Sequence, residues 1–152
     1  MTQIARTDIL SPVAGRLIAA LNAELTGRYP EEGACHFRLD PEEVAEGKGA
    51  FLVASADGVA VGCGAVRRIS ETEAEIKRMY VSPSVRGKGV GRALLSALEE
   101  EARRLGTKRL LLETGVRQPE ALALYRKSGF AEIAPFGDYA STPLSVCMGK
   151  NL

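Results

Sequence analysis

The sequence lacks the features that identify several common classes of protein. Its three cysteines, Cys35, Cys63 and Cys147, are odd in number and show no C-x-x-C spacing. This pattern predicts neither a disulfide framework nor a zinc site, so we expect no metal site and reduced thiols in a cytoplasmic protein. The only histidine, His36, follows Cys35 in a loop-like region, which disfavours a cysteine–histidine nucleophile.

An excess of charge and long apolar runs are also missing. The formal net charge is +1, which indicates neither nucleic acid nor an anionic membrane as a general partner. We expect no signal peptide and no membrane span, because the longest apolar runs are far too short to cross a bilayer. The 152 residues, 45% hydrophobic and 26% charged, are typical of one globular protein, and we expect a single domain over residues 1–152.

The apolar patterns alternate between strand and helix periods, which predicts an α/β protein. Ser11 before Pro12 is a helix N-cap signal, and Asp57-Gly58 is a hairpin turn signal. Hairpins followed by β-α-β units imply a mixed sheet with helices on both faces. The expected strands are 2–9, 50–54, 59–69, 73–81, 109–113, 130–133 and 144–148, and the main expected helices are 12–26, 90–105 and 118–128.

A glycine-rich loop follows the strand that ends at Val81. Its alternating glycines precede a helix, so backbone amides lie at a helix N-terminus, where anions bind. Glycine allows unusual dihedrals and a close approach to a ligand. The pattern predicts a pyrophosphate site made by Gly87, Gly89 and Gly91, with Arg86, Lys88 and Arg92 around it. A flexible surface loop is the alternative.

The type of loop can be narrowed by its spacing. A P-loop requires a lysine followed by serine or threonine after the glycines, and a dinucleotide fingerprint requires G-x-G-x-x-G near the start of a β-α-β unit. This loop has neither pattern. It fits R-x-x-G-x-G from Arg86 to Gly91, directly after a strand. It thus resembles the acetyl-CoA-binding motif of the GNAT N-acetyltransferase superfamily.

A second segment resembles the same superfamily. The apolar strand 109–113 is followed by a helix with Pro119 in its first turn and Gly129 at its end. A helix that ends in Tyr-x-x-x-Gly-Phe, here Tyr125 to Phe130, lies beside the thioester in that superfamily. Gln118 stands where the family often has asparagine. The resemblance covers roughly residues 50–150.

The resemblance implies a central mixed, mostly antiparallel sheet and an enzyme that moves the acetyl group of acetyl-CoA to a primary amine by direct attack in a ternary complex. A small amine or amino-acid-like metabolite is the expected acceptor, and a homodimer is an open expectation. A protein or peptide acceptor, a longer acyl group, a non-catalytic CoA-binding module and a nucleotide-binding protein are the alternatives. The residues that the resemblance assigns to acetyl-CoA binding are Met79, Tyr80, Val81, Arg86, Gly87, Lys88, Gly89, Val90, Gly91, Arg92, Gln118 and Tyr125.

Two residues are the expected catalytic groups. Tyr125 is the donor to the leaving sulfur, since a phenol pKa of ~10 is close to that of a thiol; a packing role is the alternative. Glu75, six residues before Val81, is the expected general base by resemblance. It could instead be a surface carboxylate paired with Lys77 or Arg68, and Glu113 or water could then serve as base.

The acceptor site is less clearly marked. In this fold it is formed by the first helices, the loop after them and the C-terminal strands, whose polar and aromatic candidates are Tyr29, Glu31, Glu32, His36, Arg38, Phe136, Asp138 and Tyr139. The residues around Phe136 and Asp138 suit a cationic amine. Arg38, Arg78 and Arg117 could equally hold a substrate carboxylate, and each of these residues could also be a solvated loop residue.

Overall fold

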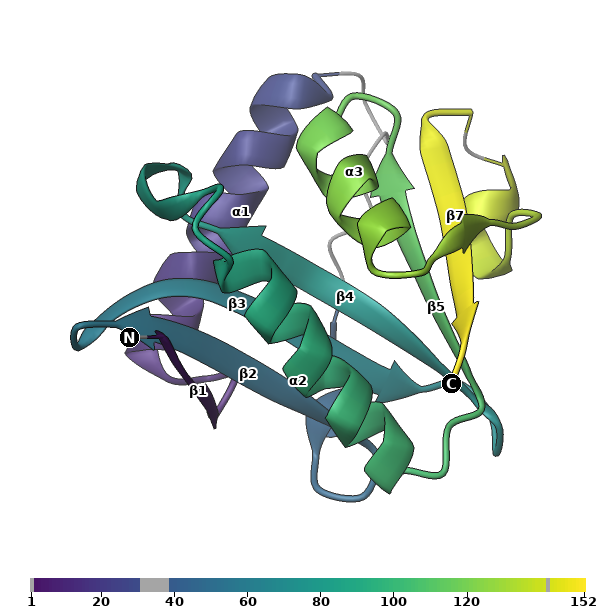
Figure 1. Ribbon diagram of the computed structural model, residues 1–152, viewed down its shortest axis with the longest axis horizontal. Coiled ribbons are helices and arrows are strands. Elements are labelled where there is room, and N and C mark those ends of the chain that lie inside the picture. The colour runs from purple at the N-terminus through teal and green to yellow at the C-terminus, as the bar shows by residue number, and fades with distance from the viewer. Residues whose placement is uncertain (1, 31–38, 142) are drawn as a thin grey trace.

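The computed structural model describes residues 2–30, 39–141 and 143–152 (Figure 1). The strands are β1 (Thr2–Arg6), β2 (Gly49–Ala56), β3 (Val59–Arg68), β4 (Glu73–Val81), β5 (Arg109–Gly115), β6 (Ala131–Glu132) and β7 (Ser145–Asn151). The α-helices are α1 (Pro12–Arg28), α2 (Val90–Arg104) and α3 (Pro119–Lys127), and the short 3-10 helices are η1 (Pro41–Val44), η2 (Pro83–Val85) and η3 (Gly137–Ser141).

Within the described residues, seven strands form one sheet in the order β1-β2-β3-β4-β5-β7-β6. Neighbouring strands are antiparallel except for β4 and β5, which are parallel. The sheet is therefore mixed and mostly antiparallel, and the α/β fold expected from the sequence is confirmed. β6 is shorter than the expected strand, whereas β7 extends three residues further because it pairs with all of β5.

Helices cover both faces of the sheet, as expected (Figure 1). Alternate residues of β2 point to opposite faces: Phe51 and Val53 pack with Leu17 of α1, and Leu52 packs with Leu94 of α2. Gly62 of β3 is closely surrounded, since a Cβ there would stand 2.7 Å from the Tyr80 carbonyl of β4 and 3.1 Å from Leu94 Cδ1 of α2. The absence of a side chain at Gly62 therefore allows α2 to lie close to β3. The sheet thus holds two cores, one beneath each helix layer.

The local signals at two turns are also confirmed. Ser11 Oγ accepts a hydrogen bond from the Ala14 amide at 3.3 Å and caps α1. Asp57 and Gly58 both have positive φ, at 51° and 79°, as a two-residue hairpin turn requires. The first helix ends at Arg28, within one residue of the expected end at Thr26-Gly27.

The strand before the glycine loop contains a bulge. Cys63 pairs with Tyr80 and Ala65 pairs with Lys77, so β4 has one more residue than β3 between these pairs. Arg78 lies there with a φ of 60°, a value that is uncommon outside glycine. β4 and β5 pair from Glu73 to Ile76 only and then diverge (Figure 1). The bulge and the divergence occur at the same level of the sheet.

Among the described residues, no helix is both long enough and apolar enough to span a membrane.

Candidate active site

Two cavities lie beside the divergence of β4 and β5. The larger, of about 500 Å³, lies between the end of α1, the glycine loop and α3. The smaller, of about 90 Å³, is lined by α1, the bulged part of β4, the end of β5 and η3. Met79, Gln118 and Tyr125 line both cavities, so the two adjoin at these side chains.

The larger cavity brings together most of the residues assigned to acetyl-CoA from the sequence. Those that line it are Met79, Tyr80, Val81, Arg86, Gly87, Gly89, Gly91, Arg92, Gln118 and Tyr125. Two do not line it: Val90 is buried in the core beneath α2, and Lys88 is exposed outside the cavity wall. Four basic and two acidic side chains line the cavity, which suits a polyanionic ligand.

The glycine loop has the geometry of an anion site. Gly87 and Gly89 have φ values of 79° and 89°, and Gly89 is the N-cap of α2. No side chain caps this helix, so its first amides are available to a ligand. A phosphate group at that end would also be stabilised by the helix dipole.

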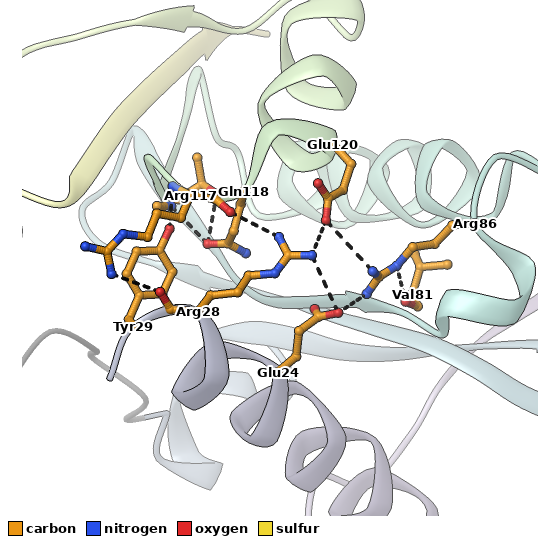
Figure 2. Close-up of polar contacts among 10 residues, drawn as sticks. Glu24, Arg28, Tyr29, Val81, Arg86, Arg117, Gln118 and Glu120 are labelled. Carbon is orange, nitrogen blue, oxygen red and sulfur yellow. Dashed lines mark hydrogen bonds and ion pairs between the residues drawn. The ribbon is translucent and has the colours of Figure 1, made fainter. Parts of the chain in front are cut away.

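An ion-pair cluster, formed by Glu24, Arg28, Arg86 and Glu120, joins α1, the glycine loop and α3. Figure 2 shows Arg28 between Glu24 and Glu120, with Arg86 beside both carboxylates. Arg86 Nη2 lies 2.5 Å from Glu24 Oε1, and its Nη1 lies 3.8 Å from Glu120 Oε1. A hydrogen bond from Arg28 to Glu120 lowers the pKa of that carboxyl. All four side chains line the larger cavity.

The loop between β5 and α3 is attached to the end of α1. The Arg117 amide donates to Tyr29 Oη at 2.8 Å, and Arg117 Nη1 donates to the Arg28 carbonyl at 2.9 Å (Figure 2). Gln118 Oε1 accepts from the Gly115 amide at 3.0 Å. A Cβ at Gly115 would collide with the Tyr29 hydroxyl. These contacts fix Gln118 at the junction of the cavities.

Tyr125 is both a core residue and a cavity residue. Its ring packs against Phe130 in an edge-to-face contact, with centroids 5.9 Å apart. Burial raises the pKa of Tyr125 well above that of a free phenol. The hydroxyl therefore stays protonated at neutral pH and can donate a hydrogen bond. Burial therefore moves the pKa of Tyr125 away from that of a thiol, to which the pKa of an unperturbed phenol is close.

Glu75 is buried and has three polar contacts, which come from two residues. It is 1% exposed, and Arg67 contacts Oε1 through Nε at 3.0 Å and Nη2 at 2.9 Å. Tyr139 Oη donates to Oε2 at 2.7 Å. The alternative of a surface carboxylate paired with Lys77 or Arg68 was wrong, since the partner across the strands is Arg67. Tyr139, and not Glu75, lines the smaller cavity.

Glu113 is the carboxylate that lines the smaller cavity, where its Oε2 accepts from Ser145 Oγ at 2.6 Å. Of the residues considered for the acceptor, Tyr29, Arg78 and Tyr139 also line this cavity. The Phe136 ring packs against Tyr139 at 5.2 Å, and Arg117 lies over the Tyr29 ring. Glu31, Glu32, His36 and Arg38 lie outside the described residues. Asp138 belongs to η3.

Sequence reasoning missed the acidic members of the ion-pair cluster, Glu24 and Glu120, and also Arg28. The one visible signal was the spacing of four residues between Glu24 and Arg28, which allows an ion pair on a helix. In the described part of the chain, no group of three or more histidine, cysteine, aspartate or glutamate side chains could hold a metal ion.

Comparisons with known proteins agree with this geometry. The sequence model of the acetyltransferase (GNAT) family matches residues 17–130. A protein of Azospirillum brasilense named IAA acetyltransferase is 45% identical over 150 residues, which cover 98% of this chain and 97% of that protein.

Solved structures also resemble the chain. A Klebsiella pneumoniae protein assigned to the acyl-CoA N-acyltransferases is 36% identical with a TM-score of 0.84, covering 100% of this chain and 98% of its own. A GNAT acetyltransferase of Elizabethkingia anophelis with acetyl-CoA bound has the same fold, with a TM-score of 0.69, 19% identity and coverage of 99% and 98%.

Proposed function

Because this chain belongs to the GNAT acetyltransferase family, whose enzymes use acetyl-CoA, we propose that it acetylates the primary amine of a small molecule. The amine would attack the thioester directly, in a ternary complex. The observation that carries this proposal is the pair of cavities that adjoin at Met79, Gln118 and Tyr125. One cavity suits a long polyanion and the other a small ligand, so both substrates can be present together.

Acetyl-CoA would be bound in the larger cavity mainly by backbone groups. The amides of the glycine loop and of the first turn of α2 would bind the pyrophosphate, with Arg86 and Arg92 at its sides. The bulge at Arg78 interrupts the β3–β4 ladder next to Met79, which supports a role for the backbone of Met79 and Val81 in binding the pantetheine and the acetyl carbonyl. The fixed amide of Gln118 would orient the pantetheine arm.

Acetyl-CoA supplies an activated acyl group with a thiolate as its leaving group. An N–C bond forms as the C–S bond breaks, the nitrogen gives up a proton, and the sulfur leaves as a thiol. Tyr125 would donate to the sulfur, since its hydroxyl stays protonated and its side chain lines both cavities. This hydrogen bond would raise the reaction rate because it stabilises the negative charge that develops on the sulfur in the transition state.

Two carboxylates could receive the amine proton, and their positions support different roles. Glu113 lines the smaller cavity, called here the acceptor-side cavity, so it would take the proton directly or through one water. Glu75 would act through Tyr139, whose hydroxyl donates to it at 2.7 Å. We therefore propose Glu113 as the base and Glu75 as a residue that positions Tyr139.

A small acceptor is supported by the size of its cavity. At about 90 Å³ it is well below the ~300–1,000 Å³ of pockets that hold drug-sized ligands. A protein or peptide acceptor, or an acyl group much longer than acetyl, would need more room than the described side chains leave.

Release of the CoA thiol from acetyl-CoA, measured over a panel of amines, amino acids and peptides, tests the proposal. We expect turnover with at least one small amine and an acceptor that gains one acetyl group by mass spectrometry. Binding of acetyl-CoA without turnover of any amine would instead support a CoA-binding module. Protection by ATP equal to that by CoA in a thermal-shift assay would support a nucleotide-binding protein.

Three further expectations are part of the proposal. We propose that the chain is a single domain and that it acts in the cytoplasm. Whether it forms a homodimer is an open expectation. The buried, unpaired thiols of Cys63 and Cys147 suit a reducing compartment. Sedimentation analysis would decide between a monomer and a dimer.

A further inference from the structure

The acceptor-side cavity contains both signs of charge. Lys77, Arg78 and Glu113 are the charged side chains among the described residues that line it. The two basic residues come from the bulged part of β4, and the acidic residue comes from β5, on the other side of the strand divergence. A ligand with one anionic and one cationic group would match this arrangement.

Arg78 is fixed in the cavity wall by backbone and side chain together. The bulge gives it a φ of 60°, and its Nη2 donates to Asn22 Oδ1 of α1 at 2.6 Å. The residue is only 8% exposed, so its guanidinium lies in surroundings where an ionic hydrogen bond is strong. A planar guanidinium fits a carboxylate with two parallel hydrogen bonds.

Glu113 is placed for the other end of such a ligand. Ser145 Oγ donates to its Oε2 at 2.6 Å, which orients the carboxylate at the end of β5. Tyr125, beside the expected position of the thioester, lines the same cavity. An amine near Glu113 would therefore lie next to the reacting carbon.

From this arrangement we propose that the acceptor is a small amino acid, whose carboxylate binds Arg78 while its amine lies at Glu113. The inference rests on the proposed acetyl transfer and names its substrate class. The cavity volume of about 90 Å³ restricts the acceptor to a small side chain. A simple amine could not make this ionic hydrogen bond, and a carboxamide would replace it with a neutral one.

The test compares matched acceptors. Glycine, alanine and serine are each assayed beside their carboxamides and their decarboxylated amines, with CoA release as the readout. For the best of these acceptors, we expect kcat/KM for the free acid to exceed that of both analogues by about 30-fold or more. In Arg78→Gln this preference should collapse, because kcat/KM for the free acid should fall far more than kcat/KM for the carboxamide. Asn22→Ala, which removes the group that orients the guanidinium, should reduce the preference partly.

Arg68→Gln is the matched control, because Arg68 is an exposed arginine of β3 that lines neither cavity; the preference should not change. Acetyl-CoA affinity and circular dichroism check that each variant folds. Amines that react as well as amino acids in the wild type would overturn the inference and leave the proposed function intact. Equal loss with all acceptors in a folded Arg78→Gln protein would also overturn it. No turnover of these compounds, with turnover of another small amine, would overturn the inference alone, whereas no turnover across the whole panel of amines, amino acids and peptides would refute the proposed function itself.

Discussion

The larger cavity, proposed for the coenzyme, and the smaller cavity, proposed for the acceptor, are built differently. One wall of the larger cavity, the proposed coenzyme side, is a continuous stretch from the bulge in β4 through the glycine loop into α2, and side chains of α1 and α3 form its other walls. The acceptor side is assembled from side chains of α1, β4, β5 and η3. A backbone site depends on glycines at fixed spacing, whereas a side-chain site can change with single substitutions that leave the fold intact. We therefore expect the glycine loop to identify the family and the side chains of the smaller cavity to determine the substrate.

The largest effect is expected on the coenzyme side. Gly89→Val puts a β-branched side chain at a φ of 89°, beside the first amides of α2. We expect acetyl-CoA affinity to fall by about 100-fold or more, because several charge-assisted hydrogen bonds to the pyrophosphate are lost together. Isothermal titration calorimetry with acetyl-CoA measures this change.

Gly58→Val separates binding from backbone strain. Gly58 lies in the β2–β3 turn with a φ of 79°, and like Gly89 it has no atom within 4 Å of an added Cβ. This control should lose similar stability and keep its acetyl-CoA affinity. Equal affinities of the two folded variants would mean that the glycine loop does not bind the coenzyme.

The second largest effect is expected at Tyr125, which lies where the two cavities adjoin. Tyr125→Phe should lower kcat by about 100-fold, since the donor to the sulfur is removed, and should change the Kd for acetyl-CoA by less than about threefold. Because burial raises the pKa of Tyr125, its ionisation should not reduce the wild-type rate below about pH 10. An unchanged kcat in steady-state assays would reduce Tyr125 to a packing residue.

On the acceptor side, the two carboxylates should separate into catalysis and stability. Glu113→Gln should lower kcat/KM by about 100-fold and remove the acid limb of the rate–pH profile. Glu75→Gln should keep most of the activity but lower the free energy of unfolding by about 2 kcal/mol, since the ionic hydrogen bonds to Arg67 are weakened. Urea denaturation and rate–pH profiles of both variants check this. The opposite pattern would make Glu75 the base.

The smallest effect is expected from the ion-pair cluster. Glu24→Gln removes a carboxylate that holds Arg86, so acetyl-CoA binding should become tighter by up to about fivefold, and less so at high salt. Glu71→Gln, an exposed residue of the β3–β4 turn outside both cavities, is the control and should bind like the wild type. Weaker binding in Glu24→Gln would show that Glu24 supports the coenzyme site.

Features that depend on neighbouring residues could be predicted from the sequence, whereas features that depend on contacts between distant residues could not. The glycine loop, the turn at Asp57-Gly58 and the cap at Ser11 depend on neighbours in sequence, so local patterns revealed them. The contact between Tyr139 and Glu75 joins residues 64 positions apart, and no local pattern indicates it. Glu75 lies six residues before Val81, an even spacing that would put both on one face of a regular strand, but the extra residue near Arg78 breaks that register. Burial, which sets the state of Tyr125, emerges only from packing.

Bisubstrate kinetics test the central claim most directly, namely that both substrates occupy adjoining cavities at the moment of transfer. Initial rates of CoA release are measured while acetyl-CoA and the best amine are varied together. Direct attack in a ternary complex predicts double-reciprocal lines that intersect. Parallel lines, together with an acetylated form of the enzyme detected by mass spectrometry, would show a covalent intermediate and contradict this account.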